Sequence, residues 1–159
     1  MTDLMSREAR SRLMSKIGSK NTKPEMTVRR ALHARGFRFR LHVKRLTGSP
    51  DLMLPKYRAV ILVHGCFWHR HKGCSMSYTP KTRQSVWMQK FAANEERDRF
   101  VRNALLAEGW RVLTVWECAV RAPEKDIQAN IERIADWLTS GNSCAEVSRN
   151  GLSQEPAED

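Results

Sequence analysis

The stretch from Ser49 to Val63, SPDLMLPKYRAVILV, contains the two strands on which we expect the fold to be built. A turn at 47–50 leads into Asp51-Leu-Met-Leu54, a short apolar segment. Pro55-Lys-Tyr57 turns the chain again into Ala59-Val-Ile-Leu-Val63, a β-branched run suited to a buried central strand. The sequence therefore predicts a sheet whose central strand is 59–63.

Helical and strand patterns continue on both sides of this pair. Thr22-Lys-Pro-Glu25 reads as a capping box that begins a helix over 23–35, which Gly36 ends. Apolar and basic residues alternate over 37–44, as in a half-buried strand with a basic outer face. We further predict a helix at 85–108, a strand at 111–116 and a helix at 124–139. Helix, three strands, helix, strand and helix make a single α/β domain.

Three segments fall outside this pattern. Residues 64–82 show no periodicity and form a long loop, which in a compact domain is usually functional. Residues 1–20 form a basic arm with a weak helical stripe, and residues 141–159 read as a disordered tail. We therefore expect a basic arm at 1–20, one folded domain at 21–140 and a tail at 141–159.

The charge of the chain indicates a polyanionic partner. The 159 residues carry a formal net charge of +11. Residues 1–45 contain 13 Lys and Arg against 3 Asp and Glu. The start, MTDLMSREARSRLM, fits neither a signal peptide nor a membrane span, so we expect a cytoplasmic protein. In that reducing compartment, four cysteines indicate a metal site or isolated thiols before disulfides.

Cys66, His71, Cys74 and Cys118 have the residue types and spacing of a closed tetrahedral zinc site. Such a site would hold the polar loop rigid, because metal binding energy is also folding energy. The alternative is that two of the cysteines are ordinary buried thiols and that His71 is a solvated loop residue. Cys144 lies in the predicted tail and is left over.

A catalytic centre is the second site that the residues suggest. His64, His69 and His71 lie within eight residues of one another, and a histidine can take a proton from water at neutral pH. They could equally be zinc ligands or surface residues. Asp51 could be a turn former, but two adjacent strands would place its carboxylate and the terminal carbonyl of strand 59–63 near one Mg²⁺ ion.

Phe67 and Trp68 are bulky apolar residues in the middle of the loop. One interpretation is a wedge that enters between base pairs, at a cost of a few kcal/mol per unstacked step. The other is that both side chains pack onto the zinc site of their own loop. Trp87, near the start of the helix 85–108, could join the wedge.

Three motifs closely resemble the very-short-patch repair (Vsr) mismatch endonucleases. They are His64-Gly-Cys-Phe-Trp-His69, Asn94-x-x-Arg97-Asp98 and Gly109-Trp-Arg-Val-Leu-Thr-Val-Trp-Glu-Cys118. The similarity runs from about Arg7 to Leu138. It implies a restriction-endonuclease-like core of the PD-(D/E)XK superfamily, which agrees with the order of elements given above.

The resemblance also implies roles for individual residues. Asp51 and the Val63 carbonyl would bind Mg²⁺, His69 would be the general base, and His64 would support the scissile phosphate. Glu25 would act through a water on the metal or through the catalytic histidine. The resemblance further implies structural zinc at Cys66, His71, Cys74 and Cys118, intercalation by Phe67, Trp68 and Trp87, and DNA contacts by Met14, Lys16, Asn94 and Arg97.

This chain departs from the family pattern at three places. Val63 stands where threonine is familiar, which a carbonyl ligand tolerates. Arg70 and Lys72 interrupt what can be a run of histidines, and one extra residue near Gly73 separates His71 from Cys74. If the zinc assignment contains an error, we expect it at this extra residue.

The function that the resemblance implies is Mg²⁺-dependent nicking of duplex DNA on the 5′ side of the thymine in a T:G mismatch. Two alternatives remain, a non-catalytic zinc-stapled binder of distorted DNA and a restriction-type nuclease that cuts paired DNA. We expect a monomer that acts at the nucleoid in the bacterial cytoplasm, with no membrane partner and with other mismatch-repair proteins as candidate partners.

Overall fold

A six-stranded mixed sheet forms the centre of the molecule in the computed structural model, which describes residues 20–154. The strands lie side by side in chain order: β1 (Arg40–Leu41), β2 (Leu52–Leu54), β3 (Ala59–His64), β4 (Arg111–Trp116), β5 (Cys144–Ser148) and β6 (Gly151–Gln154). Strands β3, β4 and β5 are parallel, and the flanking pairs are antiparallel. The α/β class expected from the sequence is confirmed.

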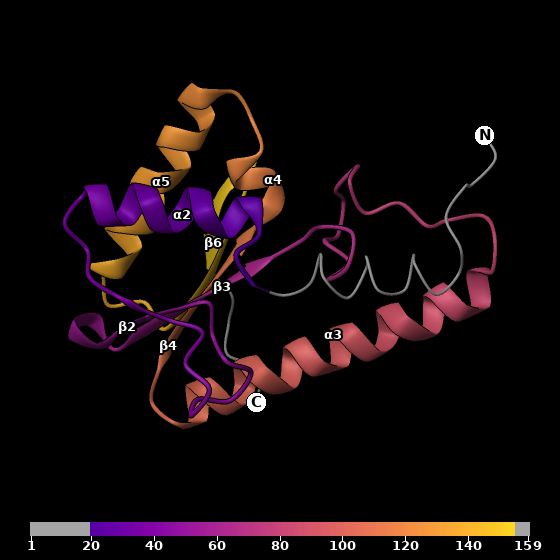
Figure 1. Ribbon diagram of the computed structural model, residues 1–159, viewed down its shortest axis with the longest axis horizontal. Helices are drawn as coiled ribbons and strands as arrows, with labels where there is room; N and C mark the ends of the chain where they lie inside the picture. Colours follow the sequence, from indigo (N-terminus) through magenta and orange to yellow (C-terminus); the bar gives the residue numbers. More distant parts are fainter. Residues whose placement is uncertain (1–19, 155–159) are drawn as a thin grey trace.

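Helices cover both faces of the sheet (Figure 1). One face packs against α2 (Lys23–Ala34) and α5 (Glu124–Leu138) through the larger core, which includes Val28, Leu32, Ile131 and Ile134. The other face packs against α3 (Gln84–Ala107), whose Leu105 is buried among side chains of β2, β3 and β4. A short helix, α4 (Glu117–Val120), follows β4 directly, and a 3-10 turn (Pro55–Tyr57) joins β2 to β3.

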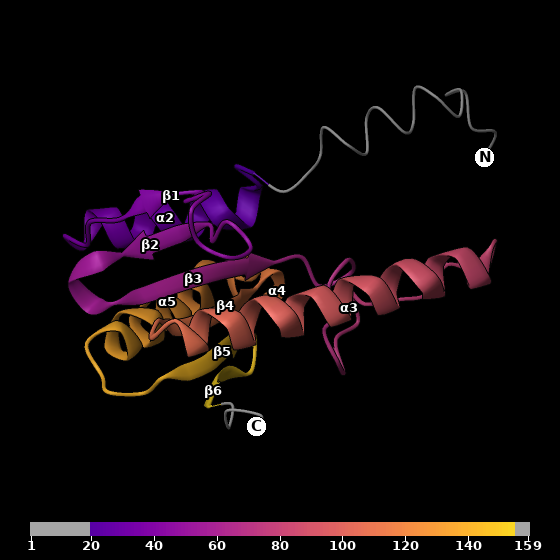
Figure 2. The same cartoon turned by 90° about the horizontal axis from the view of Figure 1, so that it is seen from below.

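Helix α3 is longer than the sheet that it covers. Its 24 residues extend their N-terminal half well beyond the strands, as both ribbon views show (Figure 2). The loop 65–83, which follows β3, runs out to reach the start of this helix. The projecting half of α3 therefore supports the loop that carries six of the predicted site residues, Cys66, Phe67, Trp68, His69, His71 and Cys74.

The predicted helices 23–35, 85–108 and 124–139 and the strands 51–54, 59–63 and 111–116 are confirmed within one or two residues. The strand predicted at 37–44 is wrong in extent, because only Arg40–Leu41 pairs with β2. His42 has a φ of 48°, which ends the extended conformation. Phe37 and Phe39 still pack against the larger core, from a segment outside the sheet.

The disorder predicted for residues 141–159 is wrong for 144–154, which form β5 and β6. Cys144, Ala145 and Val147 are buried, and β5 adds to the sheet in parallel beside β4. The Arg111 guanidinium fixes the connection that leads into β5, because it donates to the carbonyls of Trp137, Leu138 and Asn142. The polar composition of this segment concealed a strand that is buried on alternate residues.

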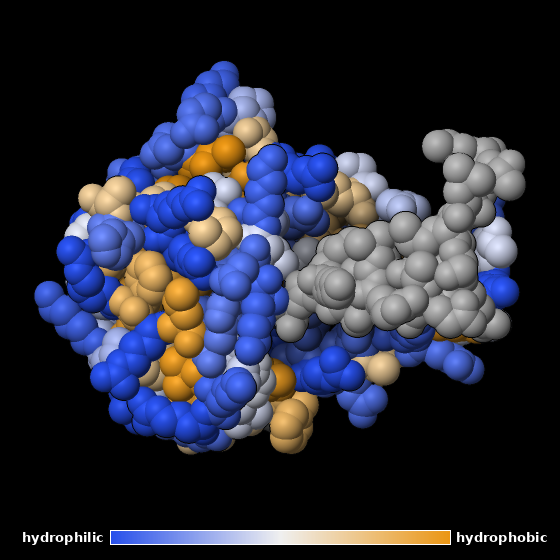
Figure 3. Space-filling model, viewed as in Figure 1, coloured by the Kyte–Doolittle hydropathy of each residue, from blue (hydrophilic) through white to orange (hydrophobic). Residues whose placement is uncertain are grey.

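The expected arm at 1–20, with the DNA contacts Met14 and Lys16, lies almost entirely outside the described residues. Within residues 20–154, the basic face is present: Lys23, Arg30, Arg38, Arg40, Lys44 and Arg45 are all exposed. Figure 3 shows a mainly hydrophilic surface on one face of the molecule, with small apolar areas. No helix of this part of the chain combines the length and the apolar character needed to cross a membrane.

We predict that Val147→Ala lowers the free energy of unfolding by about 2 kcal/mol, because it opens a cavity beside β4. Val147 is completely buried, whereas Ser153 on β6 is exposed. The control Ser153→Ala should stay within about 0.5 kcal/mol of the parent. Urea unfolding measures both variants. Equal stabilities would mean that the last hairpin does not belong to the core.

Candidate active site and metal centre

Asp51 and the end of β3 meet because β2 and β3 are antiparallel. Leu52 pairs with Ile61, so the residue before β2 lies beside the last residues of β3. The Val63 N–H donates to the Asp51 carboxylate over 2.8 Å. The N–H and C=O of one residue in a strand point to the same side, so the Val63 carbonyl lies on the edge of β3 that faces Asp51. This is the arrangement that the predicted metal ligands require.

Asp51 shares this end of the sheet with Glu25 and His42. One ligand atom from each of the three side chains lies within 4.8 Å of the other two. Burial of Asp51, with the negative charge of Glu25 nearby, raises the pKa of Asp51 to about 7, although the Val63 N–H acts in the opposite direction. A buried carboxylate beside a half-buried one favours a bound cation. The Asp51 carboxylate supplies an oxygen ligand of the kind that Mg²⁺ prefers.

His64 and His69 form a second group, at the start of the loop. Their rings stack with centroids 3.9 Å apart. The Asp98 carboxylate lies 2.6 Å from His69 Nδ1 and fixes the orientation of this ring, so that Nε2 faces away from Asp98. Burial lowers the pKa of His64 to about 3, helped by the nearby His69. His64 is therefore neutral at physiological pH.

Cys66, His71, Cys74 and Cys118 come together as the sequence predicted, with their ligand atoms all within 4.8 Å of one another. The sulfur atoms of Cys66 and Cys118 each lie 3.6 Å from His71 Nδ1. A tetrahedral zinc with bonds of about 2.3 Å to sulfur and about 2.1 Å to nitrogen separates these atoms by about 3.6 Å. The cluster fits Zn²⁺, and His71 would bind it through Nδ1.

Neighbouring elements support this Cys3His cluster. The His71 ring stacks on Trp116 at the end of β4, with centroids 4.3 Å apart. The Arg149 N–H, in the turn between β5 and β6, approaches the Cys118 sulfur at 3.5 Å. A hydrogen bond from Cys66 lowers the pKa of Cys118 to about 5, and the same contact raises the pKa of Cys66. The extra residue near Gly73 is absorbed by a left-handed turn, in which Gly73 has a φ of 71°.

The aromatic side chains form a cluster of their own. The Phe67 ring contacts those of Trp68, Tyr78, Trp87 and Phe91, with centroids 5.0 to 5.6 Å apart. Phe67 and Trp68 therefore pack against α3 and each other, whereas the cysteines pack with Trp116 and Met76. Asn94 on α3 donates to the Trp68 carbonyl over 3.1 Å. The alternative of packing onto the zinc site is not what the structure shows.

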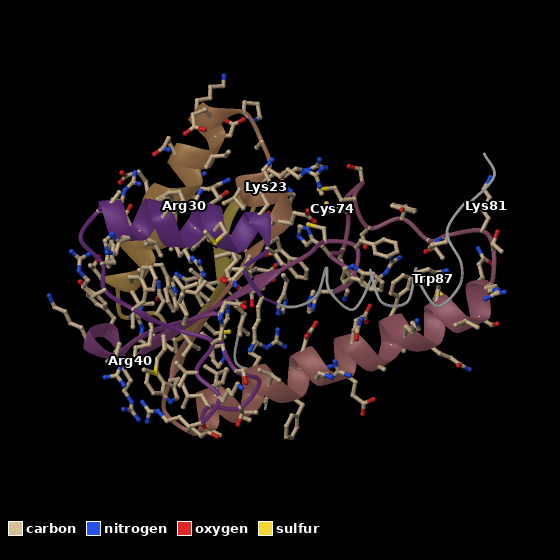
Figure 4. The ribbon with its side chains drawn as sticks, viewed as in Figure 1. Lys23, Arg30, Arg40, Cys74, Lys81 and Trp87 are labelled. Atoms are coloured by element: carbon tan, nitrogen blue, oxygen red, sulfur yellow. The ribbon has the colours of Figure 1, made fainter. Side chains whose placement is uncertain are left out.

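One cleft of about 1140 Å³ joins Asp51 and the two histidines to the aromatic cluster. Its lining includes Asp51, Val63, His64, His69, Phe67, Trp68, Asn94 and Arg97. Figure 4 shows Trp87 on the projecting part of α3, with Cys74 between it and the body of the domain. Lys23, at the start of α2, lines the opposite part of the cleft. Cations, carboxylates, histidines and aromatic rings thus face one shared space.

The comparisons with known proteins point in one direction. A family model described as DNA mismatch endonuclease Vsr matches residues 2–76. The DNA mismatch endonuclease Vsr of Escherichia coli is 38% identical over 153 residues, which is 96% of this chain and 97% of that protein. This chain belongs to the Vsr family of DNA mismatch endonucleases.

Other Vsr-family relatives carry a different description. The type II nicking enzyme V.XorIIP of Xanthomonas oryzae pv. oryzae is 52% identical over 118 residues, 74% of this chain and 86% of the relative. The type II nicking enzyme V.NmeAIP of Neisseria meningitidis is 43% identical over 121 residues, 76% of this chain and 86% of the relative. The chain is a DNA nicking endonuclease with a restriction-endonuclease-like fold, and the non-catalytic alternative is set aside.

No role was predicted from the sequence for two residues of the site, Asp98 and His42. Asp98 belongs to the Asn94-x-x-Arg97-Asp98 motif. It lies four residues after Asn94, so both residues are on one face of α3. That spacing could have identified Asp98 as a partner of the loop. His42 gave no signal, because its contact with Glu25 joins residues 17 positions apart.

We predict that the purified protein contains about one zinc per chain, which elemental analysis measures. Cys74→Ala should lose the metal and unfold at a lower temperature, because zinc binding energy is folding energy. Cys144→Ala is the matched control, since Cys144 is buried on β5 outside the cluster. It should keep its zinc. A zinc-free parent, or equal zinc in both variants, would contradict the assignment.

Asp51→Asn should stabilise the metal-free protein at pH 8. A carboxyl with a raised pKa contributes stability below its unfolded pKa and loses it as the pH rises through about 7. The advantage of Asn should therefore grow between pH 5 and pH 8, by on the order of 1 kcal/mol after allowance for solvent screening. The exposed Asp136→Asn is the control. Chemical unfolding at both pH values decides, and an advantage that is constant or shrinks with pH would contradict the prediction.

Proposed function

We propose that this Vsr-family chain nicks duplex DNA on the 5′ side of the thymine in a T:G mismatch, in a reaction that depends on Mg²⁺. The observation that carries the proposal is the single cleft that holds Asp51, His64 and His69 beside the rings of Phe67 and Trp68. The family description and the name of the Escherichia coli relative, which both specify mismatch cleavage, support it.

The proposed metal ligands are the Asp51 carboxylate and the Val63 carbonyl, which belong to two residues that line the cleft. When bound, Mg²⁺ would offset the negative charge that develops on the phosphate. Asp51 is kept in place by the Val63 N–H at 2.8 Å. Glu25 is proposed to act through a water on the metal or through the catalytic histidine, without contacting the phosphate, because it is only 1% exposed.

His69 is the proposed general base. The contact of its Nδ1 with Asp98 leaves Nε2 as the nitrogen that takes a proton from water, while the water oxygen forms the new bond to phosphorus and the bond to the leaving oxygen breaks. His64, neutral because its pKa is about 3, would donate an N–H hydrogen bond to the scissile phosphate without adding a charge.

Phe67, Trp68 and Trp87 are the proposed intercalating residues. Tyr78, which contacts Phe67 and is 64% exposed, extends the same aromatic surface. A mismatched step is easier to unstack than a paired one, so a wedge at this place would give selectivity through deformability. Asn94 and Arg97, on the face of α3 that lines the cleft, are proposed DNA contacts.

The proposed setting is the cytoplasm of a bacterium, where a monomer acts on DNA at the nucleoid. The arm at 1–20, with Met14 and Lys16, is proposed to contact the minor groove. The proposed endonuclease domain begins at residue 21 and, given β5 and β6, extends to 154. Other mismatch-repair proteins are proposed partners.

Nicking of fully paired DNA is the second candidate function. The observation that favours it is that the Xanthomonas and Neisseria relatives are named type II nicking enzymes. The same centre would serve both reactions, so the two candidates differ in the substrate that the aromatic cluster admits.

One nicking assay separates the two candidates. Labelled T:G, T:A and C:G duplexes, with randomised flanking base pairs so that the unknown context is covered, are incubated with Mg²⁺ and sequenced at the break. We predict a break 5′ of the thymine in T:G only, and equal breaks in the paired duplexes would establish the second candidate.

Asp51→Ala should lose at least about 100-fold in nicking yet keep its affinity for DNA in a gel-shift assay. Substantial residual nicking by that variant would refute the proposed centre.

A further inference from the structure

Glu25 is a buried carboxylate whose two oxygens are both occupied by donors from the protein. Oε1 accepts from the Asn21 N–H at 3.3 Å, and Oε2 accepts from Arg29 Nη1 at 3.0 Å. His42 Nε2 lies 3.0 Å from Oε1 and 3.2 Å from Oε2, and thus bridges the carboxylate. The capping box explains only the Glu25 N–H, which donates to Thr22 Oγ1. Asn21, Arg29 and His42 together determine the direction of the carboxylate.

His42 is bound to Asp51 as well as to Glu25. Its backbone N–H donates to the Asp51 carbonyl over 3.2 Å, and its side chain is only 15% exposed. Its φ of 48° is a left-handed conformation that non-glycine residues seldom adopt. Such a conformation persists only where the surroundings over-determine it, and strained residues of this kind cluster at functional sites. Here the ring and the backbone of one residue are each tied to a different carboxylate residue.

We propose that His42 is a positioning residue, which fixes Glu25 and Asp51 relative to each other so that both carboxylates face the same cation. The inference rests on the proposed function, in which Asp51 binds Mg²⁺, and assigns a role to a residue that this function leaves unexplained. His42 lines the cleft, yet its ring nitrogen is directed at Glu25. It acts through the two acids, and contact with DNA is not part of the role.

The physical reason is the cost of leaving either carboxylate loosely held. Glu25 is 1% exposed, so water cannot replace the donor that is lost with the His42 ring. The Asn21 N–H and Arg29 would then hold the carboxylate without the link to the segment that carries Asp51. His42 also donates its backbone N–H to the Asp51 carbonyl. Without the contact between its ring and Glu25, His42 would hold the segment before β2 less firmly. A displacement of about 1 Å at a catalytic centre can cost about 100-fold in rate.

Two substitutions separate the hydrogen bond from the bulk of the ring. His42→Gln keeps an N–H donor near the Glu25 carboxylate, whereas His42→Phe keeps a ring of similar size without a donor. His33→Phe is the control, because His33 is exposed on α2 and contacts only Phe39 in the described residues by its ring. We expect His42→Phe to lower kcat by about 10- to 100-fold with KM for DNA changed less than about twofold. His42→Gln should recover most of the loss.

A measurement without DNA accompanies the kinetics. Calorimetric titration of the DNA-free protein with Mg²⁺ should show weaker binding by about tenfold in His42→Phe, with near-parental affinity in His42→Gln. A double-mutant cycle with Glu25→Gln should be non-additive in kcat, since both substitutions remove the same contact. If His42→Phe does not fold, His42→Leu, which also lacks a donor, replaces it in the kinetics, the titration and the cycle.

The proposal is overturned if His42→Phe keeps parental kcat and Mg²⁺ affinity, or if His42→Gln is no better than His42→Phe. A loss of nicking in His42→Phe that is larger with Mn²⁺ than with Mg²⁺ would also overturn it, because it identifies the ring as a metal ligand. Failure of the proposed function is a distinct result: the parent then makes no Mg²⁺-dependent nick in any duplex. The calorimetric comparison still decides the role of His42 in that case.

Discussion

The hydrogen bond from the Val63 N–H to the Asp51 carboxylate is the contact on which the site depends. It links the end of the central strand β3 to the residue before its antiparallel neighbour, over 2.8 Å. Because β3 lies between β2 and β4, the carboxylate is held by a strand that is paired on both sides. His69, three ligands of the Cys3His cluster and the rings of Phe67 and Trp68 lie in the loop that leaves the same strand end, whereas Cys118 follows β4 and Trp87 lies on α3.

The two halves of the site need different physical conditions, and the fold separates them. The acids require burial with a counter-charge, which the end of the sheet provides through Val63, His42 and Arg29. The aromatic rings must remain accessible, and they lie where the loop 65–83 packs against the half of α3 that extends past the sheet. Figure 2 shows this half of the helix. The Cys3His cluster lies at the junction and holds the loop that spans both. A long helix thus serves as a support for a loop that the sheet alone could not carry.

Much of this arrangement was predictable from local patterns. Periodicity identified every helix in the described residues except the four-residue α4, and the spacing of Cys66, His71, Cys74 and Cys118 identified the cluster. Contacts between distant segments were not predictable: His42 reaches Glu25 through a left-handed bend, and the strand predicted at 37–44 ends there. Residues 144–154 were missed because a strand in that polar segment is stabilised by β4 and by Arg111, not by its own composition. Local sequence does not reveal which partner a segment will find.

The hairpin of β5 and β6 has a consequence for the order in which the protein is made. Its turn supplies the Arg149 N–H that approaches the Cys118 sulfur, and its first strand completes the parallel part of the sheet. Domains assemble as the chain leaves the ribosome, beginning from the N-terminal side. The segment that holds Asp51 and the histidines is therefore synthesised some 80 residues before the one that finishes the surroundings of Cys118. A nascent chain contains its proposed catalytic residues early. The Cys3His cluster gains all of its surroundings only after residue 149 has been synthesised.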